Sequence, residues 1–253
     1  MLKRIVQKAR SASRSIWTPR ARVSTPTTRV WTPAARRRRA ALTDEIRATF
    51  PFSKMARAES ELAPEAAGAL GAIKYFDCSH YLTLNLDRAL ALGLDRSPRL
   101  RVLDLGSGFG YFLYACRFLG HHPVGVYYED GNYPFAVRCY SRSIATLQLE
   151  RVLHRITTDP LPAEIGGAFD LVTAYQVCFD DHESDSRWGA EEWRQMLSSL
   201  KSFIHRESRL HFELNKPSNG IGVEHDVAEM FSALGARVDD PVVDMENCRA
   251  LFL

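Results

Sequence analysis

The stretch "VLDLGSGFGYF" (residues 102–112) constrains the fold of this chain more than any other part of the sequence. A short apolar run ends in Asp104 and is followed by glycines at positions 106, 108 and 110. A buried strand that breaks into a glycine-rich turn before a helix is typical of a nucleotide-type site in an open α/β sheet. The ligand of such a site lies at the carboxyl ends of the strands, close to the N-terminus of the helix.

From residue 100 onward, strand and helix patterns alternate. Strand-like apolar runs occur at residues 100–105, 123–128, 151–157, 169–175, 209–215, 236–238 and 249–253. Segments with the 3–4 spacing of an amphipathic helix lie between them, at residues 111–120, 137–147, 190–205 and 223–234. This alternation predicts an α/β, Rossmann-like, doubly wound fold with a mostly parallel seven-stranded sheet and helices on both faces.

Two classes of ligand use a glycine-rich turn of this kind. Dinucleotides favour the pattern GxGxxG, in which the third glycine allows close packing beside the pyrophosphate. That position is Tyr111 here, so the dinucleotide fingerprint fails. S-adenosylmethionine has no phosphate but carries an α-amino acid end and a sulfonium cation, and a carboxylate near the turn suits that cationic end.

Four motifs follow one another along the chain: "VLDLGSGFGYF", "VGVYYED", "DPLP" and "FDLVTAYQV". On these motifs the chain resembles the class I S-adenosylmethionine-dependent methyltransferases, over residues 98–253. The resemblance implies S-adenosyl-L-methionine as the cofactor. It also implies that five residues line the methionine side of the cofactor: Asp104, Gly106, Ser107, Gly108 and Gly110.

Two departures from the family pattern concern the adenosine end of the cofactor. The family usually ends its second strand in an acid that holds the ribose hydroxyls, whereas this chain has Tyr127. Glu129 is the candidate replacement, and an ordinary solvated acid is the alternative. The family often has an adenine-binding acid at a position that corresponds to Thr157, so Thr158 and Asp159 are the remaining candidates for this contact.

Methyl transfer is an in-line displacement that depends on positioning and, for a weakly acidic nucleophile, on a base. The region after the fourth strand contains His182, which is the candidate catalytic base; a surface histidine in an acidic loop is the alternative. Tyr175 and Gln176, at the end of that strand, are expected to approach the methyl group. Aromatic residues that precede the glycine stretch form either a lid or part of the core: Tyr75, Phe76, His80 and Tyr81.

The acceptor is narrowed only by absences. The (D/N)PP(Y/F) tetrapeptide of amino-group methylation on nucleobases and the Pro-Cys dipeptide of cytosine-carbon methylation are both missing after "FDLVTAY". The five scattered cysteines lack CxxC spacing, and no metal-ligand cluster stands out. A small-molecule or glycan-type acceptor, methylated at oxygen, is the default. A catalytically inert module with this fold and an RNA methyltransferase remain as alternatives.

The net charge of +3 hides a strong asymmetry along the chain. Residues 1–40 hold two lysines, ten arginines and no acid, whereas the rest of the chain carries 21 basic and 30 acidic side chains. We expect a basic, flexible tail at residues 1–41 and an N-terminal helical or lid segment at 42–97, whose first helix Thr43 would cap. The cofactor-binding domain follows at 98–253.

Three interpretations of the basic tail remain open. It is a solvated tail, a contact for an anionic membrane surface or another polyanion, or an organelle transit peptide. The acidic body offers no electrostatic case for binding nucleic acid. Because the five cysteines are scattered and odd in number, reduced thiols are the simplest interpretation. We expect a cytoplasmic protein, membrane-peripheral if residues 1–40 bind lipid, with organelle targeting as the alternative.

Overall fold

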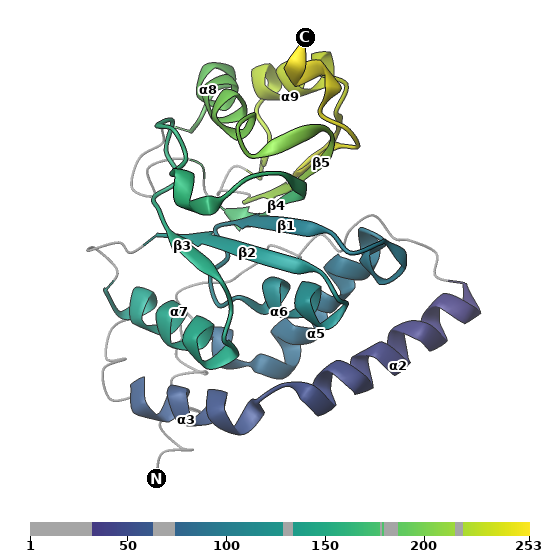
Figure 1. The fold of residues 1–253 in the computed structure, drawn as a ribbon, viewed down its shortest axis with the longest axis vertical. Coiled ribbons are helices and arrows are strands. Elements are labelled where there is room, and N and C mark those ends of the chain that lie inside the picture. The colour runs from purple at the N-terminus through teal and green to yellow at the C-terminus, as the bar shows by residue number, and fades with distance from the viewer. Residues whose placement is uncertain (1–31, 63–73, 129–133, 178, 180–186, 216–219) are drawn as a thin grey trace.

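The computed structural model describes residues 32–62, 74–128, 134–177, 179, 187–215 and 220–253. A seven-stranded sheet forms the centre of this part of the chain (Figure 1). From edge to edge the strands are β3 (Arg151–Leu153), β2 (His122–Tyr127), β1 (Arg101–Leu105), β4 (Phe169–Val177), β5 (Ile204–Leu214), β7 (Val242–Met245) and β6 (Arg237–Asp239). β1 to β5 run parallel, and β7 is antiparallel to both of its neighbours. The predicted mostly parallel, seven-stranded sheet is therefore confirmed.

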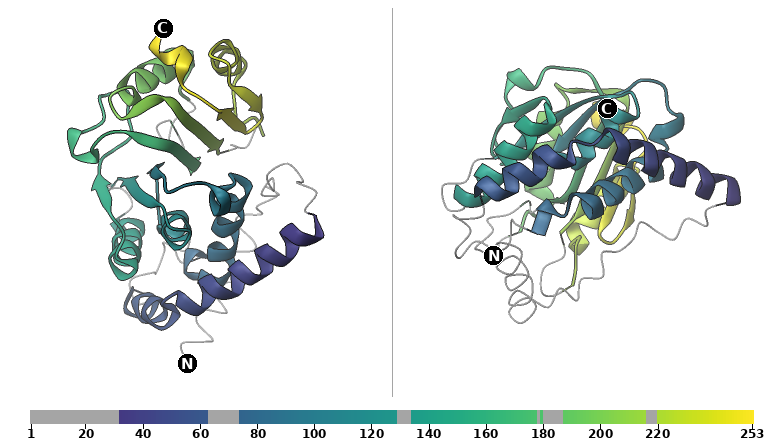
Figure 2. Two further views of the ribbon diagram at one scale, coloured as in Figure 1. Left: turned by 45° about the vertical axis from the view of Figure 1, so that its right-hand side comes forward. Right: turned by 90° about the horizontal axis from the view of Figure 1, so that it is seen from below.

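Helices cover both faces of the sheet, as predicted (Figures 1 and 2). One face carries α5 (Cys78–Ala91), α6 (Tyr111–Phe118) and α7 (Pro134–Leu147), and the other carries α8 (Ala190–Leu200) and α9 (His225–Ala233). An outer layer of α2 (Pro33–Thr49) and α3 (Phe52–Leu62) packs on α5 and α7. Short 3-10 turns are η2 (Lys74–Phe76), η3 (Leu94–Arg96), η4 (Ala163–Ile165) and η5 (Arg249–Phe252).

The sheet separates two apolar cores, because successive side chains of a strand point to opposite faces. In β1, Leu103 and Leu105 belong to the core under α8 and α9, whereas Val102 belongs to the core under α5 and α6. Trp193 and Phe212 are large buried members of the first core. Because both faces of β1 are packed against helices, the turn that follows β1 is held in a fixed position at the end of the sheet.

The first described helix begins earlier than the sequence suggested. Thr32, and not Thr43, caps α2: its side chain accepts a hydrogen bond from the Ala35 N–H, and Pro33 occupies the first helical position. Thr43 lies inside the helix and donates to the Arg39 carbonyl. The predicted boundary after residue 41 thus falls within α2, and residues 1–31 of the predicted tail lie outside the described residues.

Ion pairs explain why the end of the basic segment is helical. Arg39 donates to both carboxylate oxygens of Asp87 in α5, at 2.5 and 2.6 Å. Arg38 makes a 2.6 Å contact with Asp95 in η3. Bidentate arginine–carboxylate pairs are among the stronger charge interactions at a surface, so these two arginines attach the start of α2 to the body.

The last predicted strand is wrong. Residues 249–252 form η5, and the seventh strand is β7, which follows Pro241 and pairs with β6 in a hairpin. Leu251 is buried there on a helical turn. The predicted helix at 190–205 is shorter as well, because Ile204 already begins β5. Short apolar runs of this kind fit a strand and a buried helical turn equally well.

Candidate functional site

The glycine loop (residues 106–110) joins β1 to α6 with three residues in the left-handed backbone region. φ is +72° at Gly106, +49° at Gly108 and +80° at Gly110, a region that costs other L-residues about 1–2 kcal/mol. Around Gly108 the nearest described atom to an added Cβ would be the Gly106 carbonyl oxygen, 3.9 Å away, so the described residues leave room at this point. A ligand can approach the backbone there.

The other two glycines are also required by packing. A Cβ at Gly106 would overlap the Val177 side chain of β4. A Cβ at Gly110 would lie 2.7 Å from the methyl groups of Ile144 and Leu149. These two positions therefore hold the loop between β4 and α7, while Gly108 faces open space.

The glycine loop presents backbone N–H groups beside the N-terminus of α6. The N–H groups of Gly106 and Ser107 donate to the Val126 carbonyl of β2 and so tie the loop to the sheet. Those of Gly108 and Phe109 donate to no acceptor among the described residues. Unpaired N–H groups at a helix N-terminus favour an anionic partner such as a carboxylate.

Ser107 adds a buried hydroxyl to the loop. Its Oγ has no hydrogen-bond partner among the described residues. Gly125 of β2 makes room for it, since a Cβ at that position would lie 2.6 Å from the Oγ. A buried hydroxyl without a partner is costly, so a ligand atom or an ordered water is expected to complete this site.

Asp104 is a buried carboxyl group directly before the glycine loop. It accepts a hydrogen bond from the Thr173 Oγ1 at 2.7 Å. Burial raises the pKa of Asp104 to about 7, against the opposing effects of the Thr173 hydrogen bond and the positive charge of Arg88. The group therefore titrates near neutrality, and a cation bound beside it would favour its ionised form.

The end of β2 carries an aromatic side chain that faces α7. The Tyr127 hydroxyl lies 2.6 Å from the Ser141 Oγ, and the Arg151 guanidinium covers the tyrosine ring at 4.6 Å. Glu129, the candidate ribose acid, lies outside the described residues. Its role stays a prediction.

The adenine-side candidates lie in the connection between β3 and β4. Thr157 and Asp159 form a local turn, in which the Asp159 N–H donates to the Thr157 Oγ1 at 3.1 Å. Asp159 is exposed and Thr158 is half-buried. Both side chains are accessible to solvent, and their proposed contact with adenine stays a prediction.

Tyr175 and Gln176, which were predicted to share one role at the end of β4, lie in different environments. The Tyr175 ring packs on Phe112 and under the Arg88 guanidinium, at 4.8 and 4.3 Å. Its hydroxyl is buried without a described partner, and burial raises its pKa well above the usual value. Gln176 is exposed at the strand end. The Tyr175 ring thus lies against the α5 layer of the sheet, and the approach of either residue to a methyl group stays a prediction.

The aromatic residues before the domain pack directly on the glycine loop. Phe109 contacts the rings of Tyr75 and Phe76, at 5.5 and 5.0 Å. Tyr81 packs beside Tyr75 with its ring tilted by 49°, and His80 lies against Tyr81. Phe76 is buried and serves as core, whereas the other three are partly exposed and form a wall next to the loop.

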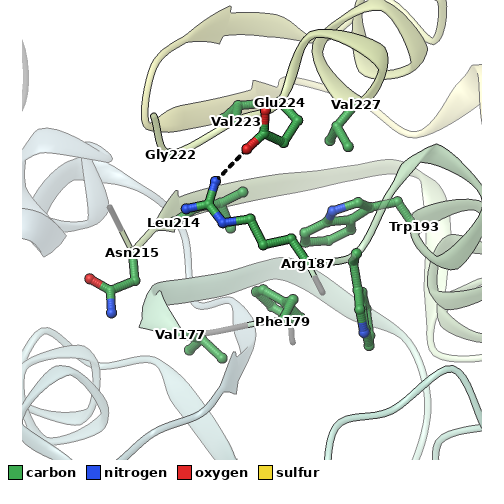
Figure 3. Close-up of a pocket in the computed structure, with 11 residues that line it drawn as sticks. Val177, Phe179, Arg187, Trp193, Leu214, Asn215, Gly222, Val223, Glu224 and Val227 are labelled. Carbon is green, nitrogen blue, oxygen red and sulfur yellow. Dashed lines mark hydrogen bonds and ion pairs between the residues drawn. The ribbon is translucent and has the colours of Figure 1, made fainter. Parts of the chain in front are cut away.

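A hollow opens at the carboxyl ends of β4 and β5 (Figure 3). Its walls are mainly apolar: Val177, Phe179, Trp188, Trp193, Val223 and Val227. Val177 also packs on Gly106, so the hollow adjoins the glycine loop. His182, the candidate base, lies outside the described residues, and its place relative to the hollow stays a prediction.

Arg187 connects the two chain segments that border the hollow. Its Nη1 donates to the Glu224 carboxylate and to the Ile221 carbonyl, both at 2.8 Å. Figure 3 shows the arginine extending across the hollow toward Glu224. The paired charges leave the hollow without a free arginine.

A buried ion pair, which was not predicted from the sequence, lies near the same strand ends. Arg88 of α5 and Glu213 of β5 lie 3.1 Å apart, and both are almost fully buried. The sequence indicates such a pair only through charged residues within apolar runs, Arg88 in "LNLDRALAL" and Glu213 in "RLHFELN". Charged residues are seldom buried unless they are paired, but the sequence does not say which residue is the partner.

Among the described residues, no group of three or more His, Cys, Asp or Glu side chains could hold a metal ion. No helix in this part of the chain is both long enough and apolar enough to span a membrane.

Comparisons with solved structures return proteins of related fold at low sequence identity. An amino pentose methyltransferase from Micromonospora echinaspora, solved with S-adenosylmethionine, is 16% identical with a TM-score of 0.39 and aligns over 53% of this chain and 50% of its own. The CcbJ methyltransferase from Streptomyces caelestis is 16% identical with a TM-score of 0.38, over 51% and 47%. A ribosomal-protein methylase from Lactobacillus delbrueckii subsp. bulgaricus is 16% identical with a TM-score of 0.38, over 68% and 78%.

The chain spans about half the length of the first two of these proteins. Neither the protein-family models nor the curated proteins that were compared with the chain gave a match. The strand order and the glycine loop give the chain the fold that its resemblance to the class I methyltransferases implies.

Proposed function

We propose that this protein is an S-adenosylmethionine-dependent methyltransferase. One observation carries the proposal: at the carboxyl end of β1, the N–H groups of Gly108 and Phe109 have no acceptor among the described residues, these residues leave room beside Gly108, and the Asp104 carboxyl group lies directly before the loop. The amino acid end of S-adenosylmethionine carries both a carboxylate and an ammonium group, which match these two kinds of partner. A phosphate would match only the donors.

The residues present therefore fit the methionyl end of the cofactor. The N–H groups of Gly108 and Phe109 would hold the carboxylate, and Ser107 would supply its unpaired hydroxyl. Asp104 would favour the ammonium group through its ionised form. The bound cofactor supplies an electrophilic methyl group on a sulfonium centre. For the adenosyl end we retain the candidates Glu129, Thr158 and Asp159.

The acceptor that we propose is a small-molecule or glycan-type compound, methylated at oxygen, which would occupy the hollow beside β4 and β5. The position of the hollow supports its assignment as the acceptor site, because Val177 lines the hollow and also packs against Gly106 of the glycine loop. Its apolar walls and the paired charges of Arg187 and Glu224 suit a neutral compound better than a polyanion. His182 would accept the proton of the attacking hydroxyl group.

The test is calorimetric titration of the protein with S-adenosylmethionine and with S-adenosylhomocysteine. The proposal predicts saturable binding of both compounds. Incubation with S-adenosylmethionine that carries a labelled methyl group, in the presence of small alcohols and sugars, would then identify the acceptor. If neither cofactor form bound to the folded protein, the methyltransferase assignment would be wrong.

A second candidate function is a catalytically inert module with the same fold. The hydrogen bond between Tyr127 and Ser141 favours this alternative, because it directs the side chain at the usual position of the ribose acid toward α7. An inert module would show no methyl transfer to any acceptor and weak or no cofactor binding. The same titration therefore separates the two candidates.

A further inference from the structure

Gln176 has a backbone conformation that its residue type disfavours. Its φ is +55°, in the left-handed region, and the pairing of β4 with β5 shifts register between Tyr175 and Val177. Gln176 is therefore the extra residue of a β-bulge. Bulges and left-handed non-glycine residues concentrate at functional sites, where they aim a side chain that a regular strand would direct elsewhere.

The register of the sheet places this bulge between the glycine loop and the hollow. Leu105 of β1 is level with Ala174 of β4, so the residues that follow each of them run side by side. On the other edge of β4, Val177 is level with Leu214, which lines the hollow. A methyl group that passes from a donor at the loop to an acceptor in the hollow would therefore pass close to this bulge.

A buried ion pair fixes the Gln176 side chain. Its Nε2 donates to the Glu213 Oε1 at 3.3 Å, and the same oxygen lies 3.1 Å from the Arg88 Nη2. Arg88 is further held by the Asn85 Oδ1 and by the Tyr175 ring. A carboxylate that is paired with arginine only accepts hydrogen bonds, so it selects the orientation of the carboxamide in which Nε2 faces Glu213.

This orientation leaves the Gln176 Oε1 without a described partner at an exposed strand end. We infer that this oxygen recognises the sulfonium methyl group of S-adenosylmethionine and gives the site a preference for the methyl donor over its demethylated product. Glu213 and Arg88 act as positioning residues for that oxygen. The inference rests on the proposed function, since it takes S-adenosylmethionine as the ligand of the glycine loop.

The chemistry of the two cofactor forms supports this discrimination. S-adenosylmethionine carries a positive charge on sulfur and a polarised methyl group, whereas S-adenosylhomocysteine carries neither. A carbonyl oxygen has a partial negative charge, so it attracts the first form and has little effect on the second. The remaining contacts of the cofactor are common to both forms.

The test compares the affinities of the two compounds, measured by calorimetry, in the full chain and in Gln176→Gly. We expect the affinity for S-adenosylmethionine to fall about tenfold, while that for S-adenosylhomocysteine changes less than twofold. The thermal midpoint should stay at or above that of the wild type, because glycine adopts a positive φ without strain. Gln176→Met has a side chain of similar length without the carboxamide, and it should also lose the preference for S-adenosylmethionine over S-adenosylhomocysteine.

Ala168→Gly is the matched control, since Ala168 also has a left-handed φ, of +58°, at the opposite end of β4. It should change neither affinity. Glu213→Gln allows the Gln176 carboxamide to turn over, and it should lower the preference in a folded protein. Equal losses for both compounds, or no loss for either, in Gln176→Gly would overturn the inference. Absence of binding to the wild type would instead overturn the proposed function.

Discussion

The hydroxyl of Tyr127 lies 2.6 Å from the Oγ of Ser141, and this contact ties the last residue of β2 to α7. Arg151 covers the other side of the same ring. The side chain that ends β2 is thus committed to the helix layer. A ribose-binding acid in this part of the chain would therefore follow position 127, as predicted for Glu129.

Tyr127→Phe tests this separation of roles. Loss of one hydrogen bond should lower the free energy of unfolding by about 1 kcal/mol and leave the affinity for S-adenosylmethionine unchanged. Glu129→Ala should instead lower the affinity about tenfold with little effect on stability. Chemical unfolding and calorimetry measure the two quantities. A large loss of affinity in Tyr127→Phe would show that the tyrosine itself contacts the ligand.

Gly108→Val should abolish cofactor binding while the protein remains folded. The added side chain would fill the room that the described residues leave beside the Gly108 and Phe109 N–H groups, and its backbone strain is confined to the half-buried turn. Gly120→Val is the matched control: φ is +92° there, and no atom of the described residues lies within 4 Å of an added Cβ. Both variants should lose similar stability in thermal unfolding, but only Gly108→Val should lose binding. Unchanged affinity in a folded Gly108→Val protein would contradict the cofactor assignment.

The sequence was sufficient for those parts of the fold that depend on local patterns. The strand before Gly106, the turn and the helix after it follow from apolar periodicity and from glycine at fixed positions. The order of the seven strands agrees with the expected class of fold. Thr43 and the final strand were misassigned because a cap and a short apolar run are decided by tertiary contacts, namely the attachment of α2 by Arg39 and the burial of Leu251.

The candidate site was only partly predictable, for a physical reason. The conformations of Gly106, Gly108 and Gly110 follow from residue type, since glycine tolerates positive φ. The direction of Tyr175 and the bulge at Gln176 depend on the register of β4 against β5, which an isolated sequence does not specify. The Arg88–Glu213 pair likewise joins residues that lie far apart along the chain.

Asp104 should make cofactor binding depend on pH near neutrality. Its pKa is raised to about 7 by burial, so the ionised form that favours a bound ammonium group gains population as the pH rises from 6 to 8. The affinity for S-adenosylmethionine should increase over this range, and Asp104→Asn should bind more weakly and with little pH dependence. Calorimetry at several pH values provides the measurement. An unchanged pH profile in the variant would exclude this role.

Asp104 should also affect the stability of the fold, which should decrease with rising pH while the cofactor affinity increases. The folded protein retains the Asp104 proton up to a pH near 7, whereas the unfolded chain releases it near the ordinary aspartate pKa of 3.8. The free energy of unfolding should therefore fall as the pH rises from about 4 to 7. Asp104→Asn removes this cost and should be more stable than the wild type at pH 8, as measured by urea unfolding. Lower stability of the variant at that pH would contradict the expectation.

Asp244 of β7 should protect the fold against acid. Burial alone would raise its pKa, but the nearby His211 ring, whose Nδ1 lies 3.8 Å from the Asp244 Oδ2, and the hydrogen bonds and charge of Arg209 hold the pKa well below its ordinary value. The resulting stability is present above about pH 4 and is lost as the pH falls toward the lowered pKa. Asp244→Asn should cost about 3 kcal/mol at pH 7, because Arg209 loses its buried partner. Its acid unfolding curve should be flatter than that of the wild type between pH 4 and 2.

The basic N-terminal segment should divide into two parts that respond differently to truncation. Deletion of residues 1–31 should leave thermal stability and cofactor affinity unchanged. Deletion of residues 1–41 should lower the thermal midpoint, because it removes the Thr32 cap and the pairs of Arg38 and Arg39 with Asp95 and Asp87. Equal midpoints for the two truncated proteins would show that these pairs contribute nothing to stability.

The positive charge of the basic N-terminal segment should affect binding to a polyanionic partner and should not affect binding of the cofactor. We expect the full chain to bind anionic lipid vesicles, and the chain without residues 1–31 to bind them more weakly. This expectation follows from the basic residues of the segment and from apolar Leu2, Ile5, Val6 and Ile16 at its start. The binding should weaken with salt, because the Debye length falls from about 10 Å at 0.1 M to about 3 Å at 1 M. Tighter binding to RNA than to vesicles at equal salt would instead favour an RNA substrate, and binding to neither would show that the segment does not serve as a contact for either polyanion.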